Sequence, residues 1–281
     1  MKRPAHGFSR RRRRAAGALL VASLLACAAA AHEPVFGIGP ETIYEGGLGV
    51  EVGFGFDDVG DRRTQELHTE LLYGVTPDLS LTLEVPTSLR TETPMGSASG
   101  VGDVLLRGKY RFWNRNRLGA TERASLLLGV KFPTGPHHRN VPLGSGSFDA
   151  LAGLSLAHES RRWYGFGTYR YVWRTRHDGL DRGDRSLFDV AGGFRPWLTE
   201  YLQPDLVLLL EFNGEWAERD RRRGDRLRGT GGLVGWLGPT ALLSYRNVLL
   251  KTGLQLPVAV ELDGSQERPE LRAVAAVEYH F

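Results

Sequence analysis

The strictest constraint in this sequence is the alternation of apolar and polar residues from Glu270 to Phe281. A period of two residues is typical of a β-strand with one apolar and one more polar face. The stretch closes on two aromatic residues, Tyr279 and Phe281. A soluble protein seldom exposes such residues on an unpaired strand edge. In a transmembrane barrel the last strand closes against the first, and aromatic residues form the interfacial girdle. We therefore predict a closing barrel strand here.

Eleven earlier segments alternate in the same way, for example 79–85, where Leu79, Leu81, Leu83 and Val85 share one face. The other ten are 48–56, 66–75, 103–112, 123–132, 149–156, 163–175, 188–195, 206–215, 231–245 and 250–258, of which 231–245 is the least regular. Long polar loops, such as Thr87–Gly100, alternate with short turns, as in outer-membrane barrels. The sequence predicts an all-β fold, a 12-stranded antiparallel transmembrane β-barrel. A soluble β-sandwich or lipocalin-like barrel would also alternate, but it rarely needs twelve strands of this length.

The first 31 residues are typical of a cleaved signal peptide. Lys2, Arg3 and the run 10–14 form a positive region, an apolar stretch follows, and residues 29–31 offer an Ala-x-Ala cleavage site. We expect a barrel domain over 47–281 and, between it and the signal peptide, a periplasmic N-terminal segment over 32–46, which is rich in Pro and Gly.

Charge argues against a nucleic-acid partner. Seven of the 36 basic residues and none of the 32 acidic ones lie in the signal peptide, so the remainder carries 29 basic and 32 acidic residues. The basic character is therefore a targeting feature, and nucleic-acid binding has no support from composition. The only cysteine, Cys27, would leave with the signal peptide.

The inward faces of the predicted strands are unusually charged. We predict that the lumen is lined by acidic residues on two neighbouring strands, basic residues on the next two, and further charges beyond: Glu66, His68, Glu70, Glu84, Arg107, Lys109, Arg111, Lys131, Arg170, Arg174, Glu211 and Glu215. Facing ladders of opposite charge can orient a polar solute in a water-filled passage. They can equally fill the inside of a small barrel with ion pairs. Both interpretations stay open.

Enzyme chemistry and metal binding have weaker support. A barrel lipase needs a histidine on the outward face, and His68 and His280 face inward. The loop residues His137, His138, His177, Asp178 and Asp181 could imitate the rim groups of a barrel protease, but such residues are usually solvated. We predict no enzyme, no cofactor and no metal site, because spacing identifies no ligand set. A new N-terminus at His32 could nevertheless chelate copper.

Several short stretches resemble the outer-membrane family named for the meta-pathway of phenol degradation. They are GVGD (100–103), RGKY (107–110), KFPTG (131–135), LQLPV (254–258) and the closing YHF (279–281). The start, 32–40, resembles a subgroup linked to metal-resistance gene neighbourhoods. The resemblance implies a 12-stranded outer-membrane barrel that passes small solutes, including aromatic or hydrophobic ones, and no catalytic residues.

Together these observations predict a channel in the outer membrane of a Gram-negative cell, in contact with membrane lipids and a small-molecule solute. Tyr279 and Phe281 resemble the signal read by the barrel assembly machinery. The alternatives are a structural or metal-associated barrel with a side-chain-filled lumen and, with less support, an outer-membrane hydrolase.

Overall fold

The computed structural model describes residues 32–199 and 203–281. The predicted signal peptide, 1–31, lies outside the described residues. Within these two ranges, no helix is both long and apolar enough to cross a bilayer.

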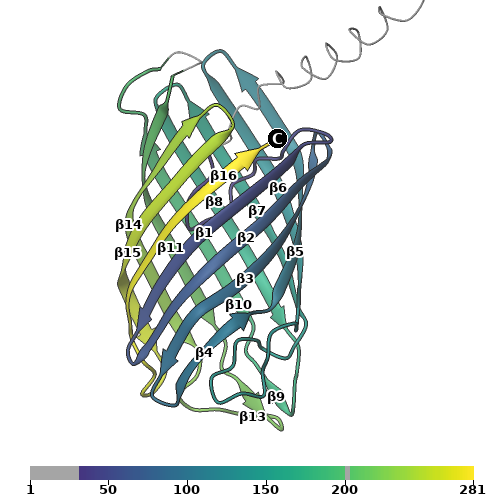
Figure 1. Cartoon of the computed structure of the whole chain (residues 1–281), viewed down its shortest axis with the longest axis vertical. Coiled ribbons are helices and arrows are strands. Elements are labelled where there is room, and N and C mark those ends of the chain that lie inside the picture. Colours follow the sequence, from purple (N-terminus) through teal and green to yellow (C-terminus); the bar gives the residue numbers. More distant parts are fainter. Residues whose placement is uncertain (1–31, 200–202) are drawn as a thin grey trace, which may run out of the picture.

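The described part of the chain is built from sixteen strands (Figure 1). Twelve of them form the wall: β1 (Leu48–Val59), β2 (Arg62–Thr76), β3 (Leu79–Thr93), β5 (Val104–Arg117), β6 (Ala120–Phe132), β7 (Asp149–Ser160), β8 (Trp163–Arg174), β10 (Arg185–Phe194), β11 (Asp205–Ala217), β14 (Gly232–Tyr245), β15 (Val248–Leu262) and β16 (Pro269–His280). The other four are short: β4 (Gly96–Val101) pairs with the end of β3, while β9 (Leu180–Asp181), β12 (Arg221–Arg222) and β13 (Asp225–Arg226) form a small sheet in the loops.

The wall is a closed antiparallel barrel, which confirms the predicted fold. Each wall strand pairs with two neighbours, and β1 pairs with both β2 and β16. The closing register sets Val50 opposite Tyr279 and Phe56 opposite Ala273. The C-terminal strand therefore lies where the alternation of Glu270–Phe281 placed it, and closure leaves neither of these two strands with a free edge.

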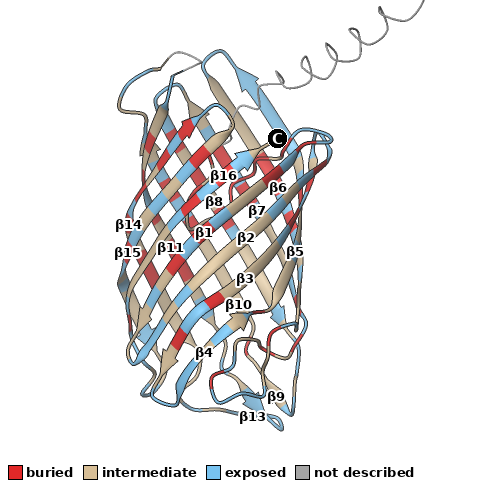
Figure 2. Cartoon of the chain, viewed as in Figure 1, coloured by how far each residue is buried: buried red, intermediate tan, exposed pale blue. Residues whose placement is uncertain are grey.

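Period-two alternation decides which side chains face out. In β6 the outward Leu126 and Leu128 are 48% and 65% exposed, whereas Leu127 between them is fully buried. Figure 2 shows buried and exposed residues alternating along the strands. The outer surface is a belt of leucine, valine and aromatic side chains, which is the surface that a lipid bilayer covers.

On the outer surface of the barrel, aromatic residues gather at the end that carries the short turns. Trp163 and Phe194 are paired across β8 and β10 with ring centroids 6.1 Å apart, and Tyr279 lies 4.9 Å from Phe281. All four are exposed. Such a ring of exposed aromatic side chains is typical of the membrane interface.

Two predicted connections are shorter than expected. The connection between the predicted strands 48–56 and 66–75 is reduced to Gly60 and Asp61, because β1 and β2 stay paired up to Val59 and Arg62. Most of the predicted loop Thr87–Gly100 is a hairpin of β3 and β4. These extensions beyond the apolar belt are mostly polar and carry only scattered apolar residues such as Leu89, so hydrophobic alternation could not reveal them.

The irregularity expected over 231–245 is also present. The register of β14 against β15 shifts between Gly235 and Trp236. Pro239, a little further along, has no amide hydrogen to donate to a ladder.

Candidate functional site

The N-terminal segment, 32–46, enters the barrel and docks on the inner face of its wall. Three inward hydroxyl groups donate hydrogen bonds to its backbone. Ser155 and Thr168 donate to the carbonyl oxygen of Ile38 at 2.7 Å and 2.6 Å, and Ser125 donates to that of Pro40 at 2.6 Å. Because these hydroxyls lie near the middle of β6, β7 and β8, the segment reaches about half-way into the lumen.

A buried carboxylate on β11 holds the first part of the segment. The amides of Val35 and Phe36 donate hydrogen bonds to the two oxygens of Glu211, at 2.7 Å and 2.9 Å. Thr240 on β14 donates its hydroxyl hydrogen to the same carboxylate at 2.6 Å. An extended segment inside a barrel has amides without ladder partners, and Glu211 satisfies two of them.

Ion pairs fasten the acidic and basic side chains of the segment. Glu33 pairs with Lys109 on β5, and Glu41 pairs with Arg123 on β6 at 2.5 Å. At the segment's start, the Nε2 atom of His32 lies 3.4 Å from a carboxylate oxygen of Asp205.

The expected periplasmic position of 32–46 therefore needs correction, because these contacts lie inside the lumen. At its far end the segment returns to the barrel rim. The Tyr44 hydroxyl donates to the carbonyl oxygen of Phe281, and the Gly46 amide donates to that of Gly74 at 2.8 Å. Pro and Gly signalled irregular backbone, but nothing in the local pattern showed that the wall would bind it.

Part of the lumen wall beside the segment is apolar. The inward residues Ala157, Tyr164, Phe166, Ala191, Val207, Leu209, Leu242 and Leu249 form one buried cluster, with Val35 packed against it. These residues belong to strands β7 to β15 at the end with the short turns. One side of the lumen is thus hydrophobic, and the segment covers it.

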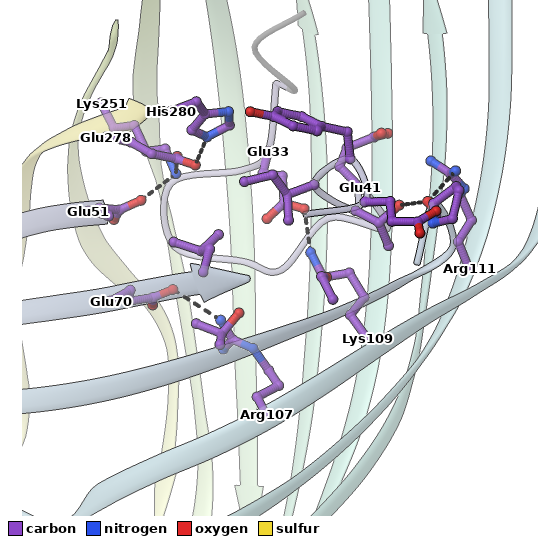
Figure 3. Close-up of a pocket in the computed structure, with 18 residues that line it drawn as sticks. Glu33, Glu41, Glu51, Glu70, Arg107, Lys109, Arg111, Lys251, Glu278 and His280 are labelled. Atoms are coloured by element: carbon purple, nitrogen blue, oxygen red, sulfur yellow. Dashed lines mark hydrogen bonds and ion pairs between the residues drawn. The ribbon is translucent and has the colours of Figure 1, made fainter. Parts of the chain in front are cut away.

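The opposite side of the lumen holds a cavity of about 520 Å³ between the segment and the wall. Its lining combines segment residues, such as Ile43 and Tyr44, with inward residues of β1, β2, β3, β5, β15 and β16. Figure 3 shows carboxylates and basic side chains from both surfaces turned toward this space.

Lys251 is the centre of the charge network on one wall of the cavity. Its ammonium group lies 2.6 Å from Glu51 and 2.7 Å from Glu278, and His280 lies 2.5 Å from the second oxygen of Glu278. Three adjacent strands, β1, β15 and β16, supply these residues, so the network spans the closure of the barrel.

The predicted acidic and basic ladders contact one another. Arg107 lies 3.2 Å from Glu70 and 4.0 Å from Glu84, and His68 lies 3.9 Å from Glu84. Glu66 shares the same face of β2, two residues before His68. The acidic and basic residues predicted on neighbouring strands therefore contact one another inside the lumen.

The remaining predicted lumen residues each meet a specific partner. Lys109 and Glu211 bind the N-terminal segment, as described above. The other pairs are Arg111 with Asp78 at 2.8 Å, Lys131 with Asp149 at 2.5 Å, Arg170 with Asp189 at 2.6 Å, Arg174 with Asp149 at 3.8 Å, and Glu215 with Arg185 at 3.0 Å.

One polar network inside the barrel was not predicted as a site. Gln255 donates to Asn213 at 2.8 Å, Asn213 donates to Asp189 at 2.7 Å, and Arg272 donates to Gln255 at 2.7 Å. The guanidinium of Arg272 also lies 4.8 Å from the ring centre of Phe36 in the segment. Alternation places these side chains inward, but it cannot show which of them touch.

Asp103 organises the loop that joins β6 and β7, 133–148, hereafter the β6–β7 loop. Its carboxylate accepts hydrogen bonds from the Gly135 amide at 3.0 Å and from the Ser145 amide and hydroxyl at 2.7 Å and 2.6 Å. Burial alone would raise the pKa of Asp103, but these hydrogen bonds and Lys131 outweigh it and lower the pKa. Asp103 of the GVGD stretch thus binds Gly135 of the KFPTG stretch, and the two stretches together anchor this loop.

The chain resembles known proteins in sequence pattern and in fold. A family model described as "Putative MetA-pathway of phenol degradation" matches residues 31–243. No curated protein matches the sequence. The structure is similar to an outer membrane channel from Pseudomonas putida F1, with a TM-score of 0.74 and 15% identity over 89% of this chain and 100% of that one. It is also similar to the NanC porin, with a TM-score of 0.53 and 10% identity over 82% of this chain and 98% of that one.

Proposed function

Because this chain belongs to the family named for the MetA pathway of phenol degradation, whose model covers most of it, we propose that it is an outer-membrane channel for small solutes, among them small aromatic or hydrophobic compounds. The similar solved structures are an outer membrane channel and a porin, which supports this assignment. The residues in the lumen then decide what passes.

The cavity of about 520 Å³ is the observation that carries the proposal. A cavity of about 150 Å³ lined by apolar side chains is large enough to bind benzene, so this space can hold a small aromatic molecule. Its lining offers apolar contacts from Ile43, Tyr44 and Leu72 beside the charged residues. Such a mixture of apolar surface and a few oriented polar groups is typical of small-molecule sites.

The N-terminal segment narrows the route through the barrel. It is bound to the wall from β5 to β11, so a solute passes between the segment and the strands around the cavity, or passes when the segment leaves its docked position. We therefore expect a low permeability that favours small molecules.

Proteoliposomes and planar bilayers test the proposal. The wild-type protein should pass small ions and carry a small aromatic solute into vesicles, whereas a solute too large for the cavity should stay outside. Arg107→Gln removes a positive charge from the lining and should shift ion preference toward cations. Arg115→Gln, on the exposed part of the same strand, is the matched control and should leave the preference unchanged.

A structural barrel with a filled lumen is the second candidate, because the inward charges are paired and the segment occupies the lumen. It predicts vesicles that remain impermeable to every small ion and solute although the protein is inserted. That result would refute the channel proposal and leave the fold intact.

A further inference from the structure

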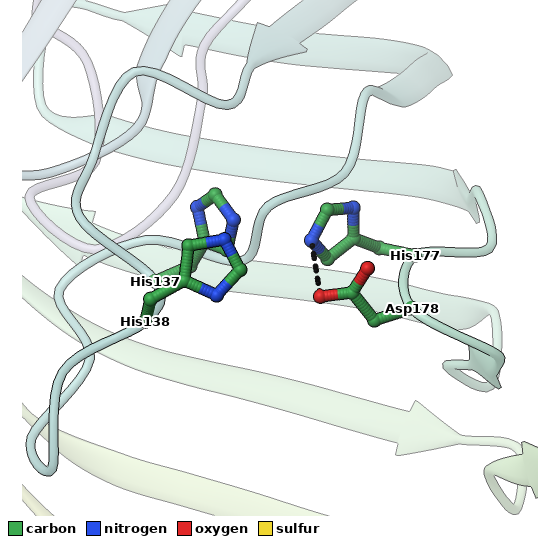
Figure 4. A group of neighbouring side chains, drawn as sticks. All are labelled: His137, His138, His177 and Asp178. Atoms are coloured by element: carbon green, nitrogen blue, oxygen red, sulfur yellow. Dashed lines mark ion pairs between the residues drawn. The ribbon is translucent and has the colours of Figure 1, made fainter.

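Three histidines and one aspartate from two different loops meet at the end of the barrel opposite the C-terminus. His137 and His138 belong to the β6–β7 loop, and His177 and Asp178 lie between β8 and β9. Figure 4 shows the three imidazole rings and the carboxylate turned toward a common space. One nitrogen or oxygen atom from each residue lies within 4.8 Å of the corresponding atoms of the other three.

The backbone fixes the position of His177 and Asp178. His177 and Leu180 exchange two backbone hydrogen bonds of 2.9 Å, which closes a two-residue turn. The residues between them, Asp178 and Gly179, have φ angles of 49° and 75°. Two left-handed residues in an Asp-Gly pair are typical of a type I′ hairpin turn. The carboxylate is therefore held beside the imidazole rather than placed there by a flexible loop.

The second loop is held against the first by a close backbone approach. Gly146 has a φ angle of 71°, and a Cβ atom on it would lie 2.7 Å from Nε2 of His177 and 3.0 Å from Cδ2 of His137. The two rings thus rest on the backbone of the β6–β7 loop, whose ends are fixed by Asp103. The turn thus fixes one half of the cluster, Asp103 fixes the loop that carries the other half, and Gly146 lets the two halves approach closely.

The cluster is polar and crowded, and one of its buried nitrogen atoms makes no hydrogen bond. The ring centres of His137 and His138 are 3.9 Å apart, and those of His137 and His177 are 4.6 Å apart. The Nε2 atom of His177 is shielded from solvent and makes no hydrogen bond, although it lies 3.1 Å from a carboxylate oxygen of Asp178. Protonated imidazoles this close would repel one another, whereas a shared cation would use their lone pairs and the carboxylate together.

The donor set indicates which cation fits. Imidazole nitrogen suits Zn²⁺, Cu²⁺ and Ni²⁺, whereas Mg²⁺ and Ca²⁺ prefer oxygen ligands. Three histidines and one carboxylate can supply the four ligands of a tetrahedral site. With bonds of roughly 2.1 Å, tetrahedral ligand atoms lie roughly 3.4 Å apart. The present separations of up to 4.8 Å need only small side-chain rotations to reach this spacing.

We propose that His137, His138, His177 and Asp178 bind a divalent late first-row transition-metal ion, with Zn²⁺ as the representative, and that the bound ion cross-links the two loops. In the sequence these residues are grouped only as loop residues that could imitate the rim of a barrel protease, and their spacing identified no ligand set because the two halves lie in separate loops. The proposal does not depend on what the lumen conducts, since it concerns only these two loops.

Titration of the folded barrel with metal salts tests the proposal. The full mature chain, without a polyhistidine tag, is folded in detergent and titrated by calorimetry with ZnCl₂, and with MgCl₂ as the negative control. One Zn²⁺ per chain should bind, and Mg²⁺ should not compete. The double variant His137→Ala/His177→Ala should lower the Zn²⁺ affinity by at least about 100-fold. Loss of a residue that only hydrogen-bonds to a metal ligand lowers affinity by about 100-fold at most, so a larger loss indicates direct ligands.

Two matched variants separate this site from other histidines. His158→Ala removes an exposed histidine on β7, at the opposite end of the barrel, and His32→Ala removes the histidine at the start of the described chain. Both should keep wild-type Zn²⁺ affinity. Absence of saturable Zn²⁺ binding to the wild type, or equal affinity in the double variant, would overturn the proposal. Loss of binding in His32→Ala alone would also overturn it, because the ion would then lie at the N-terminal segment.

A second readout covers folding and the loop cross-link. Heat-modifiable migration on gels reports whether each variant is a folded barrel, and His177→Gln replaces the double variant if that one does not fold. Trypsin can cleave after Arg139, which is exposed in the β6–β7 loop next to His138. Zn²⁺ should slow this cleavage in the wild type and not in the variant. Equal protection in both proteins would show that the ion does not join the loops.

Discussion

The hydrogen bonds of Glu211 provide a direct test of how the N-terminal segment is held. Its carboxylate accepts the amide hydrogens of Val35 and Phe36 at 2.7 Å and 2.9 Å. A hydrogen bond to a charged group contributes about 1.5–3 kcal/mol. Glu211→Ala removes two such bonds, but water that reaches the freed amides restores part of the lost free energy. The substitution should therefore weaken docking by about 3 kcal/mol. Since about 1.4 kcal/mol is a tenfold change, the undocked population should rise about 100-fold.

Cysteine labelling measures that population. The only native cysteine, Cys27, lies in the predicted signal peptide, so Val35→Cys places a single thiol in the mature chain. In the docked segment this position is partly buried against the apolar cluster of the wall. The labelling rate with a bulky maleimide should therefore rise about 100-fold when Glu211→Ala is added, in proportion to the undocked fraction.

Glu215→Ala is the matched control, because Glu215 lies on the same strand and pairs with Arg185 rather than with the segment. It should leave the labelling rate of Val35→Cys unchanged. A rate for Glu211→Ala within threefold of its parent, in protein that migrates as a folded barrel, would refute the argument that these two hydrogen bonds hold the segment.

Two further parts of the barrel give predictions. Lys251→Met leaves the carboxylates of Glu51 and Glu278 facing each other without a cation, and should lower the free energy of unfolding in urea by about 3–5 kcal/mol; a loss below about 1 kcal/mol would show that water already screens the network. Asp103→Asn should speed tryptic cleavage after Arg139, because the β6–β7 loop loses its charged acceptor; unchanged cleavage would place the loop anchor elsewhere. Since the folded-state pKa of Asp103 lies below its ordinary 3.8, its stabilising effect is complete above that pH and is lost as the pH falls through the folded value. The difference in unfolding free energy between wild type and Asp103→Asn should therefore persist at pH 5 and vanish in stronger acid, and a difference that is constant across this range would contradict the assignment.

Most of the barrel wall was predictable because the alternation of residues within one strand already indicates which side chains face the lipid and which face the lumen. Leu126, Leu127 and Leu128 are chemically identical, yet their positions along the strand determine that the first and third face outward and the second faces inward. The same alternation led to the closing pair of β1 and β16. The hairpin of β3 and β4 extends beyond the apolar belt, where hydrophobicity no longer alternates, and for this reason the sequence predicted a loop there.

The sequence by itself therefore determined the strands, their inward and outward faces and the closed fold. Only the tertiary structure decided which inward and loop residues meet. Glu211 is predicted to face the lumen, but its partners are the amides of residues 35 and 36, which are 176 and 175 positions away. His177 and Asp178 meet His137 and His138 because β7 and β8 pair side by side, so the loop before β7 and the loop after β8 lie at the same end of the barrel. Periodicity reports the environment of a side chain within its own strand, whereas contacts between distant segments depend on how the whole barrel closes around them.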